Sequence, residues 1–151
     1  MKTIFIIAGV AIILIIGGVW RSQSLQSRDP DIISRRGIHW HPHLAIYVKG
    51  VPQETPANIG VGPQYASASG YDTRMQMTAV HTHDASGTIH FEFESGPVHR
   101  GDLTLGQFFK IWGKDMHSFG SNMRMTVNGK ENTEYENYSM RDGDKIELRY
   151  D

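Results

Sequence analysis

The sequence contains no cysteine, which rules out disulfides, thiolate metal ligands and thiol nucleophiles together. It also lacks an excess of either charge. The formal net charge of the 151 residues is −1, so we expect neither a basic surface for nucleic acid nor an acidic tail. No serine lies in a nucleophile-elbow motif, and no glycine-rich loop has the pattern that binds phosphates. Any chemistry must come from other side chains.

Histidine is the residue that the sequence has in excess. Of the eight histidines, six fall in two short segments, 38–49 and 79–92. In the first segment His39, His41 and His43 are spaced two residues apart, so they would share one face of a strand. The apolar residues that alternate along the rest of this segment would form the opposite face and turn toward a core.

The second segment predicts a β-hairpin. Its loop, Asp-Ala-Ser-Gly at 84–87, has typical turn residues. The resulting register places His81 opposite His90 and puts a polar set on one face: His81, His83, His90 and Glu92. Directly opposed Cβ atoms lie roughly 4.5–5.5 Å apart, which lets two imidazoles reach one ion. A slip of one residue would scatter both the histidines and the apolar residues behind them.

This clustering predicts a metal site, since neutral imidazole is the commonest protein ligand for zinc, copper, nickel and iron. The expected ligands are three or four of one set: His41, His43, His81, His83 and His90. The prediction requires the first segment to lie beside the hairpin. His39 is the weakest member because it is nearest the preceding polar segment. His99 and His117 lie in predicted loops and are interpreted as incidental.

Two further residue types lie near the predicted site. Glu92 is a candidate ligand, imidazole-orienting acceptor or general base, although it also fits a plain solvated strand face. Asp84 has the same chemistry but begins a turn, which favours a structural role. Met-x-Met pairs at 75–77 and 123–125 would suit copper if exposed and would fill gaps if buried in the core.

The N-terminus carries an almost unbroken apolar run, Ile4–Trp20, which predicts a helix of about 25 Å. That length is at the short end for spanning a bilayer. A cleaved signal peptide is the alternative, but no convincing small-residue cleavage site follows the run, and Trp20 is typical of a membrane interface. We therefore expect residues 1–21 to form a transmembrane anchor or an uncleaved signal.

Two signals for membrane orientation oppose each other. Lys2 favours a cytoplasmic N-terminus, whereas the arginines after the helix favour the reverse: Arg21, Arg28, Arg35 and Arg36. Because an apolar segment at the start of a chain usually acts as an export signal, we expect a single-pass membrane protein with an extracytoplasmic domain. The polar residues 22–37 are then a tether to a histidine-rich domain at 38–151.

The histidine-rich domain has clear signals for one helix and several strands. Thr104 begins a capping box and Gly113 provides a stop for a helix over 104–112. Asn-Gly at 128–129 predicts a hairpin, and the alternating residues 145–150 predict a closing strand. These elements predict an α+β fold, with a mixed or antiparallel sheet covered by one short helix and preceded by the transmembrane helix.

Two resemblances accompany this fold prediction. The last half, a hairpin followed by a helix and a strand pair, resembles the β-grasp or ubiquitin-like arrangement, which implies no chemistry. The motifs at 39–44, 81–90 and 105–109 resemble a family of small, largely uncharacterised prokaryotic proteins that are often membrane-anchored or attached to exported domains. The resemblance covers most of residues 38–150. It implies a shared histidine site and names no activity.

The leading interpretation is a membrane-anchored extracytoplasmic domain that binds copper or zinc for metal delivery, buffering or sensing. Its expected partners are the metal ion, the membrane through the N-terminal helix, and a membrane or exported protein. One alternative is a zinc-dependent hydrolase, in which three histidines hold zinc and Glu92 or Asp84 moves protons. Another is a non-catalytic β-grasp-like interaction module whose histidines respond to pH.

Overall fold

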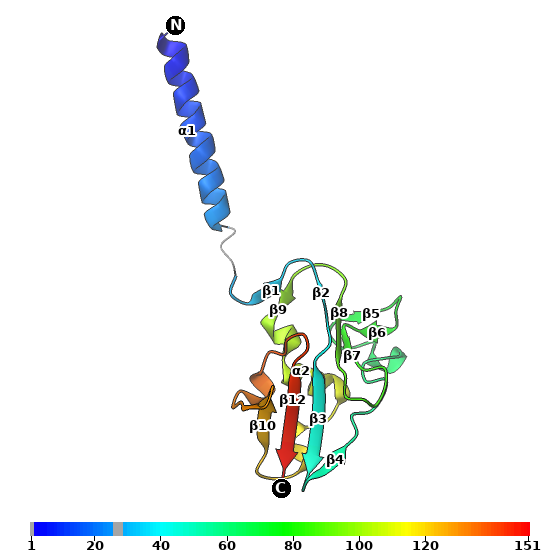
Figure 1. Cartoon of the computed structure of the whole chain (residues 1–151). Helices are drawn as coiled ribbons and strands as arrows, with labels where there is room; N and C mark the ends of the chain where they lie inside the picture. Colours follow the sequence, from blue (N-terminus) through cyan, green and yellow to red (C-terminus); the bar gives the residue numbers. More distant parts are fainter. Residues whose placement is uncertain (1, 26–28) are drawn as a thin grey trace. The chain divides into compact units, whose positions relative to one another are not determined.

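The computed structural model describes residues 2–25 and 29–151. Residues 1 and 26–28 lie outside the described residues, and with them lie Arg28 and part of the predicted tether. The chain divides into two units, Met1–Pro30 and Asp31–Asp151, whose elements are drawn in Figure 1. Each unit is described by itself.

The first unit contains helix α1, Lys2–Leu25. Its described apolar side chains between Ile12 and Trp20 are largely exposed. Among residues 2–25 and 29–151, no helix is both long and apolar enough to cross a membrane. The predicted transmembrane helix is therefore not supported, although the predicted helical conformation of this segment is confirmed.

The main sheet of the second unit has five strands in the order β11-β10-β12-β3-β4. Their bounds are β3 His43–Val48, β4 Val51–Gln53, β10 Arg124–Val127, β11 Lys130–Glu131 and β12 Lys145–Tyr150. In Figure 1 the last strand, β12 in red, lies beside β3 in cyan. This central pair is parallel, and the other pairs are antiparallel. The predicted mixed sheet of an α+β fold is confirmed.

Two tight turns shape the ends of this sheet. Asn128 and Gly129 have φ values of 53° and 76°, and Lys49 and Gly50 have values of 50° and 80°. Positive φ at both central residues is the geometry of the two-residue hairpin turns that match the twist of a sheet. Strand β4 lies at the edge, where Pro52 lacks an N–H for a further neighbour.

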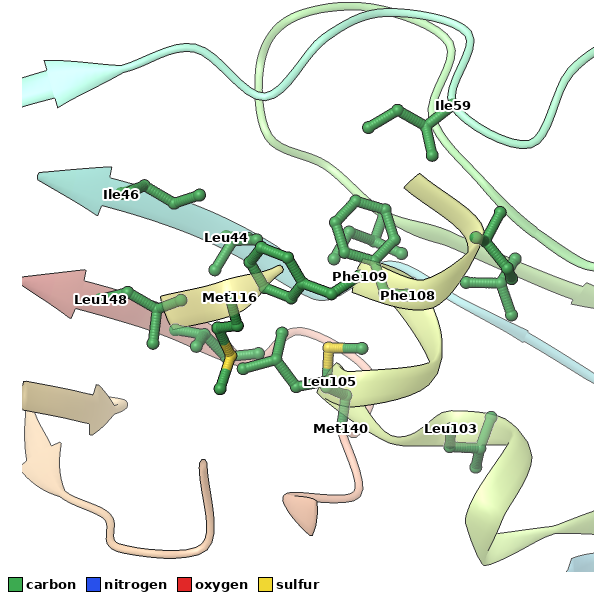
Figure 2. Packing of buried hydrophobic residues seen from close by; sticks show 14 of the residues in the cluster. Leu44, Ile46, Ile59, Leu103, Leu105, Phe108, Phe109, Met116, Met140 and Leu148 are labelled. Atoms are coloured by element: carbon green, nitrogen blue, oxygen red, sulfur yellow. The ribbon is translucent and has the colours of Figure 1, made fainter. Parts of the chain in front are cut away.

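Helix α2, Leu105–Trp112, covers the sheet as predicted. Thr104 Oγ1 accepts a hydrogen bond of 3.2 Å from the Gln107 N–H, and Gly113 ends the helix with φ 71°. The buried side chains of the helix lie in one cluster with residues of β3 and β12, as Figure 2 shows for Leu105, Phe108, Phe109, Leu44, Ile46 and Leu148. The cap and the apolar face of this helix therefore fix its position over the sheet.

A second sheet has three strands in the order β2-β8-β7: β2 Ile38–Trp40, β8 His90–Phe93 and β7 Val80–His81. Two small sheets pair β1, Ile32–Ser34, with β9, Val98–His99, and β5, Tyr71–Asp72, with β6, Met77–Thr78. Short 3₁₀ helices lie at Pro63–Tyr65, Arg100–Leu103, Met116–Phe119 and Tyr135–Asn137. Strand β1 falls within residues 22–37, which the sequence assigned to a tether.

The single strand predicted over 38–49 is wrong. The strand is interrupted at residues 41–42, and the two parts, β2 and β3, belong to different sheets. Pro42 has no N–H for a ladder, and its carbonyl accepts a bond of 2.9 Å from the Ile89 N–H. The His41 N–H is donated to Asp142 Oδ1 at 2.8 Å. Because both backbone groups have partners outside a regular ladder, the strand cannot continue through this point.

The sequence predicted a single sheet, but the histidine hairpin belongs to the three-stranded sheet and not to the main one. The hairpin that joins the main sheet is β3–β4. The first predicted hairpin strand, near 74–82, is divided between β6 and β7. At the division, Ala79 donates its N–H to the Gly70 carbonyl at 2.9 Å and accepts from the Glu92 N–H at 2.7 Å.

Candidate metal centre

The three-stranded sheet determines which histidines meet. His81 pairs with His90 between β7 and β8, which confirms the register predicted for the hairpin. On the other edge of β8, His39 of β2 pairs with Glu92. Since residues two apart share a face, His90 and Glu92 of the central strand lie on the same face as both of these partners. The sheet therefore gathers imidazoles from three strands around one carboxylate.

Four residues form the first group that could hold a metal ion: His81, His83, His90 and Glu92. One ligand atom from each lies within 4.8 Å of the others. The Nε2 atoms of His81 and His83 are 3.2 Å apart. Two nitrogens that bind one tetrahedral ion at about 2.0–2.1 Å are about 3.4 Å apart, so this pair is close to the separation that a shared ion needs.

The imidazole of His81 is fully buried and has a defined orientation. Its Nδ1 is 2.9 Å from the Thr78 carbonyl oxygen. Because a carbonyl only accepts, Nδ1 carries the proton, and in the neutral ring the lone pair is on Nε2, which faces His83. A hydrogen bond of this kind, from the nitrogen that does not bind the ion, is typical of histidine ligands.

Gly60 supports this orientation. Its carbonyl accepts from the Thr78 N–H at 2.8 Å, which holds the backbone that carries the acceptor for His81. Gly60 has φ 77°, and a Cβ atom there would lie 2.6 Å from the Val80 carbonyl oxygen. Only glycine fits this approach without displacing the strand that carries His81.

His90 supplies the clearest unsatisfied group. Its Nδ1 is buried and has no hydrogen-bond partner within the part of the chain that the structure describes. The nearest carboxylate oxygen, Glu92 Oε1, is 3.7 Å away. The rings of His83 and His90 lie edge to face, with their centroids 4.5 Å apart. A buried polar atom without a partner costs about 1–3 kcal/mol, and a bound ion would satisfy it.

Burial also sets the protonation of these rings. Burial lowers the pKa of His81 below its ordinary value. The pKa of His90 is lowered by burial first and then by the neighbouring imidazoles of His83 and His41. Both shifts favour the neutral imidazole, which is the form that binds metal ions.

A second group consists of His39, His41 and Glu92. The Nε2 atoms of His39 and His41 are 3.1 Å apart, and His39 Nε2 is 3.4 Å from Glu92 Oε1. This group is more exposed than the first, since 65% of the His39 side-chain surface is accessible. The ring of His41 lies edge-on to that of His90 with centroids 4.8 Å apart. The two groups are therefore adjacent and share Glu92.

The predicted ligands are divided by this geometry. His81, His83 and His90 lie in the first group and His41 lies in the second. His43 is in neither of the groups found among the described residues, because it begins β3, beyond the break at Pro42, and is bridged to Thr88. His39, ranked as the weakest candidate, is part of the second group. Its spacing of two residues from His41 is the sequence signal that favours it.

Asp84, Met123 and Met125 have structural roles. Asp84 Oδ1 accepts the Ser86 N–H at 2.9 Å within the turn, as its position suggested. Met125 is buried in the core and Met123 packs against that core. Met75 instead lines an open pocket of about 460 Å³ beside the second group, together with Arg36, His39, Glu92 and Glu94.

No protein-family model, curated protein or solved structure matches this chain. Groups of histidine and glutamate lie close enough to one another to hold a metal ion.

Proposed function

We propose that the Asp31–Asp151 unit is a transition-metal-binding domain whose principal ligands are His81, His83 and His90. The observation that carries the proposal is the buried Nδ1 of His90, which has no partner among the described residues and lies beside two other imidazoles. The Nε2–Nε2 separation of 3.2 Å between His81 and His83 supports a shared ion. Glu92 is the fourth candidate ligand.

Copper and zinc are the proposed metals because imidazole nitrogen suits both. Three histidines with one carboxylate fit a four-coordinate zinc ion. Met75, beside His39 and Glu92 in the open pocket, supplies a thioether that would favour Cu(I). A site assembled from fully buried and exposed imidazoles, and partly open to solvent, suits metal delivery, buffering or sensing.

A zinc-dependent hydrolase is the second candidate, and the pocket of about 460 Å³ is the observation that favours it. The pocket places space for a small molecule next to His39 and Glu92. In such an enzyme a zinc-bound water would be the nucleophile, and Glu92 would accept its proton. Hydrolysis of a test ester or phosphoester that requires zinc and is lost on Glu92→Gln would favour this candidate.

We also propose that the main sheet is a β-grasp-like arrangement. The support is its strand order, β4-β3-β12-β10-β11. In this order β3 and β12, the sheet's first and last strands along the chain, form a parallel pair at the centre, and α2 lies across one face. The resemblance of the histidine motifs to a prokaryotic family remains a prediction. The extracytoplasmic location, the membrane and an exported or membrane protein as partners also remain predictions.

Equilibrium dialysis with copper and with zinc tests the metal proposal. Wild-type protein should retain metal, and the His81→Ala/His90→Ala double variant should bind it at least tenfold more weakly. The single variant His83→Ala changes an exposed side chain and should weaken binding while leaving the thermal unfolding of the metal-free protein unchanged. His99→Ala/His117→Ala removes two imidazoles outside both groups and is the matched control. Equal binding by all four proteins would refute the proposal.

A further inference from the structure

Glu92 belongs to both histidine groups. Its Oε1 is 3.4 Å from His39 Nε2 on one side and 3.7 Å from His90 Nδ1 on the other. A carboxylate has two oxygens with about four lone-pair sites, so it can bind two ions at once. Its position on the central strand of three places it between the two outer strands.

Each outer strand brings its own pair of imidazoles. His39, in the middle of β2, and His41, just beyond its end, have Nε2 atoms 3.1 Å apart. His81 and His83, at and just beyond the end of β7, have Nε2 atoms 3.2 Å apart. Both separations are close to the roughly 3.4 Å between two nitrogens on one tetrahedral ion. The sheet therefore presents two similar chelating pairs.

A single ion does not account for both pairs. Neighbouring strands are about 4.8 Å apart, so the backbones of the two outer strands are separated by about 10 Å. The two pairs accordingly fall into separate groups, and only Glu92 is common to them. Paired metal sites in proteins have ions about 3.5–4 Å apart, a distance that a carboxylate on the middle strand can span.

We propose that the cluster holds two metal ions bridged by the Glu92 carboxylate. One ion is bound by His81, His83 and His90, and the other by His39 and His41. This inference rests on the proposed metal-binding function and adds a second ion to it. Glu92 supplies the negative charge that lies between the two cations.

The two ions differ in accessibility and therefore in affinity. The first has a fully buried ligand, His81, and a largely buried one, His90. The second is bound by exposed imidazoles and faces the open pocket that Met75 also lines. Ordering exposed side chains costs conformational entropy, and fewer protein ligands reach this ion. The second ion should bind more weakly and exchange first.

The test is the number of Cu(II) ions bound per chain at saturation, measured by elemental analysis after equilibrium dialysis of the full chain. Wild-type protein should bind two ions, and His39→Ala/His41→Ala should bind one. Bridged Cu(II) ions couple magnetically, so the electron paramagnetic resonance signal of the doubly loaded wild type should integrate to fewer spins than the copper ions it contains. Glu92→Gln should restore the full signal per bound copper. Thermal unfolding of the metal-free variants checks that they fold.

Three results would overturn the inference. A single ion in wild type, unaffected by His39→Ala/His41→Ala, would eliminate the second site while leaving the proposed function intact. Two ions in both proteins would place the second ion elsewhere. No bound metal in any protein would refute the proposed function itself, and the paired site with it.

Discussion

The metal-free protein should lose stability as the pH falls from 8 to 5, because one buried and one largely buried histidine resist protonation. His81 is fully buried, and burial lowers its pKa. His90 has a lowered pKa through burial and through the adjacent imidazoles of His83 and His41. In the unfolded chain both rings return to an ordinary pKa of about 6.5. The unfolded state therefore binds more protons than the folded state below that pH.

The direction and the size of this change in the free energy of unfolding follow from proton linkage. Since the unfolded state binds the extra protons, the free energy of unfolding falls as the pH falls through about 6.5, and the penalty is absent above that value. Each extra proton contributes a slope of about 1.4 kcal/mol per pH unit, so two histidines set an upper limit of about 2.8 kcal/mol per pH unit. The slope vanishes again below the lowered pKa values of the folded state. Asp72 and Asp84, whose pKa values are lowered by hydrogen bonds, titrate below this window.

Urea unfolding at pH 8, 7, 6 and 5 in the presence of a chelator measures this dependence. The slope should be reduced in His90→Gln, which keeps a polar side chain of similar length but does not titrate. His117→Gln, a change at an exposed histidine in neither group, is the matched control. A free energy of unfolding that is constant between pH 8 and 5 would refute the argument that these rings are kept neutral by burial.

Three further predictions concern metal, a turn and a helix cap. Zinc or copper at a concentration 100 times its dissociation constant should stabilise the protein by about 2.7 kcal/mol and raise its Tm by on the order of 10 °C. The Tm of His81→Ala/His90→Ala should not rise with metal. Gly87→Ala should destabilise the fold by about 1–3 kcal/mol in urea unfolding, because Gly87 has φ 88° and its added Cβ would collide with the Leu44 carbonyl oxygen. Thr104→Ala should cost about 1 kcal/mol in the same assay through loss of the cap of α2.

Each of these has its own control. The metal-dependent rise in Tm should persist in His99→Ala/His117→Ala, and a rise that also persists in the variant lacking His81 and His90 would show that the ion binds elsewhere. Stability unchanged by the alanine at position 87 would contradict the close approach of the turn to β3. Thr104→Ser keeps the hydroxyl acceptor and should retain most of the stability that the alanine variant loses.

Local patterns in the sequence were enough to predict much of the fold. The Thr104 cap, the Gly113 stop and the Asn-Gly turn at 128–129 depend on neighbouring residues, and all three are confirmed. The pairing of His81 with His90 was also predictable. The structure has the predicted register, and a slip of one residue would have mixed the imidazoles with the apolar residues.

The rest depends on contacts between distant parts of the chain. The alternation of His39, His41 and His43 predicted one strand, but Pro42 and the bond from the His41 N–H to Asp142 break it. His43 consequently joins the main sheet, whereas His39, His81 and His90 lie in the three-stranded sheet. Pro42 is a local sign of this break, but the groups that fix it, the Ile89 N–H and Asp142, lie far along the chain. The parallel pairing of β3 with β12 has no signal in nearby residues, since the two strands are about a hundred positions apart.

X-ray absorption spectroscopy of the zinc-loaded protein would show which atoms surround the ion. Zinc held by the histidines should give imidazole scattering with zinc–nitrogen distances of about 2.0–2.1 Å, and that scattering should be lost in His81→Ala/His90→Ala. A spectrum of zinc surrounded only by oxygen, identical in wild type and variant, would contradict binding by the histidines.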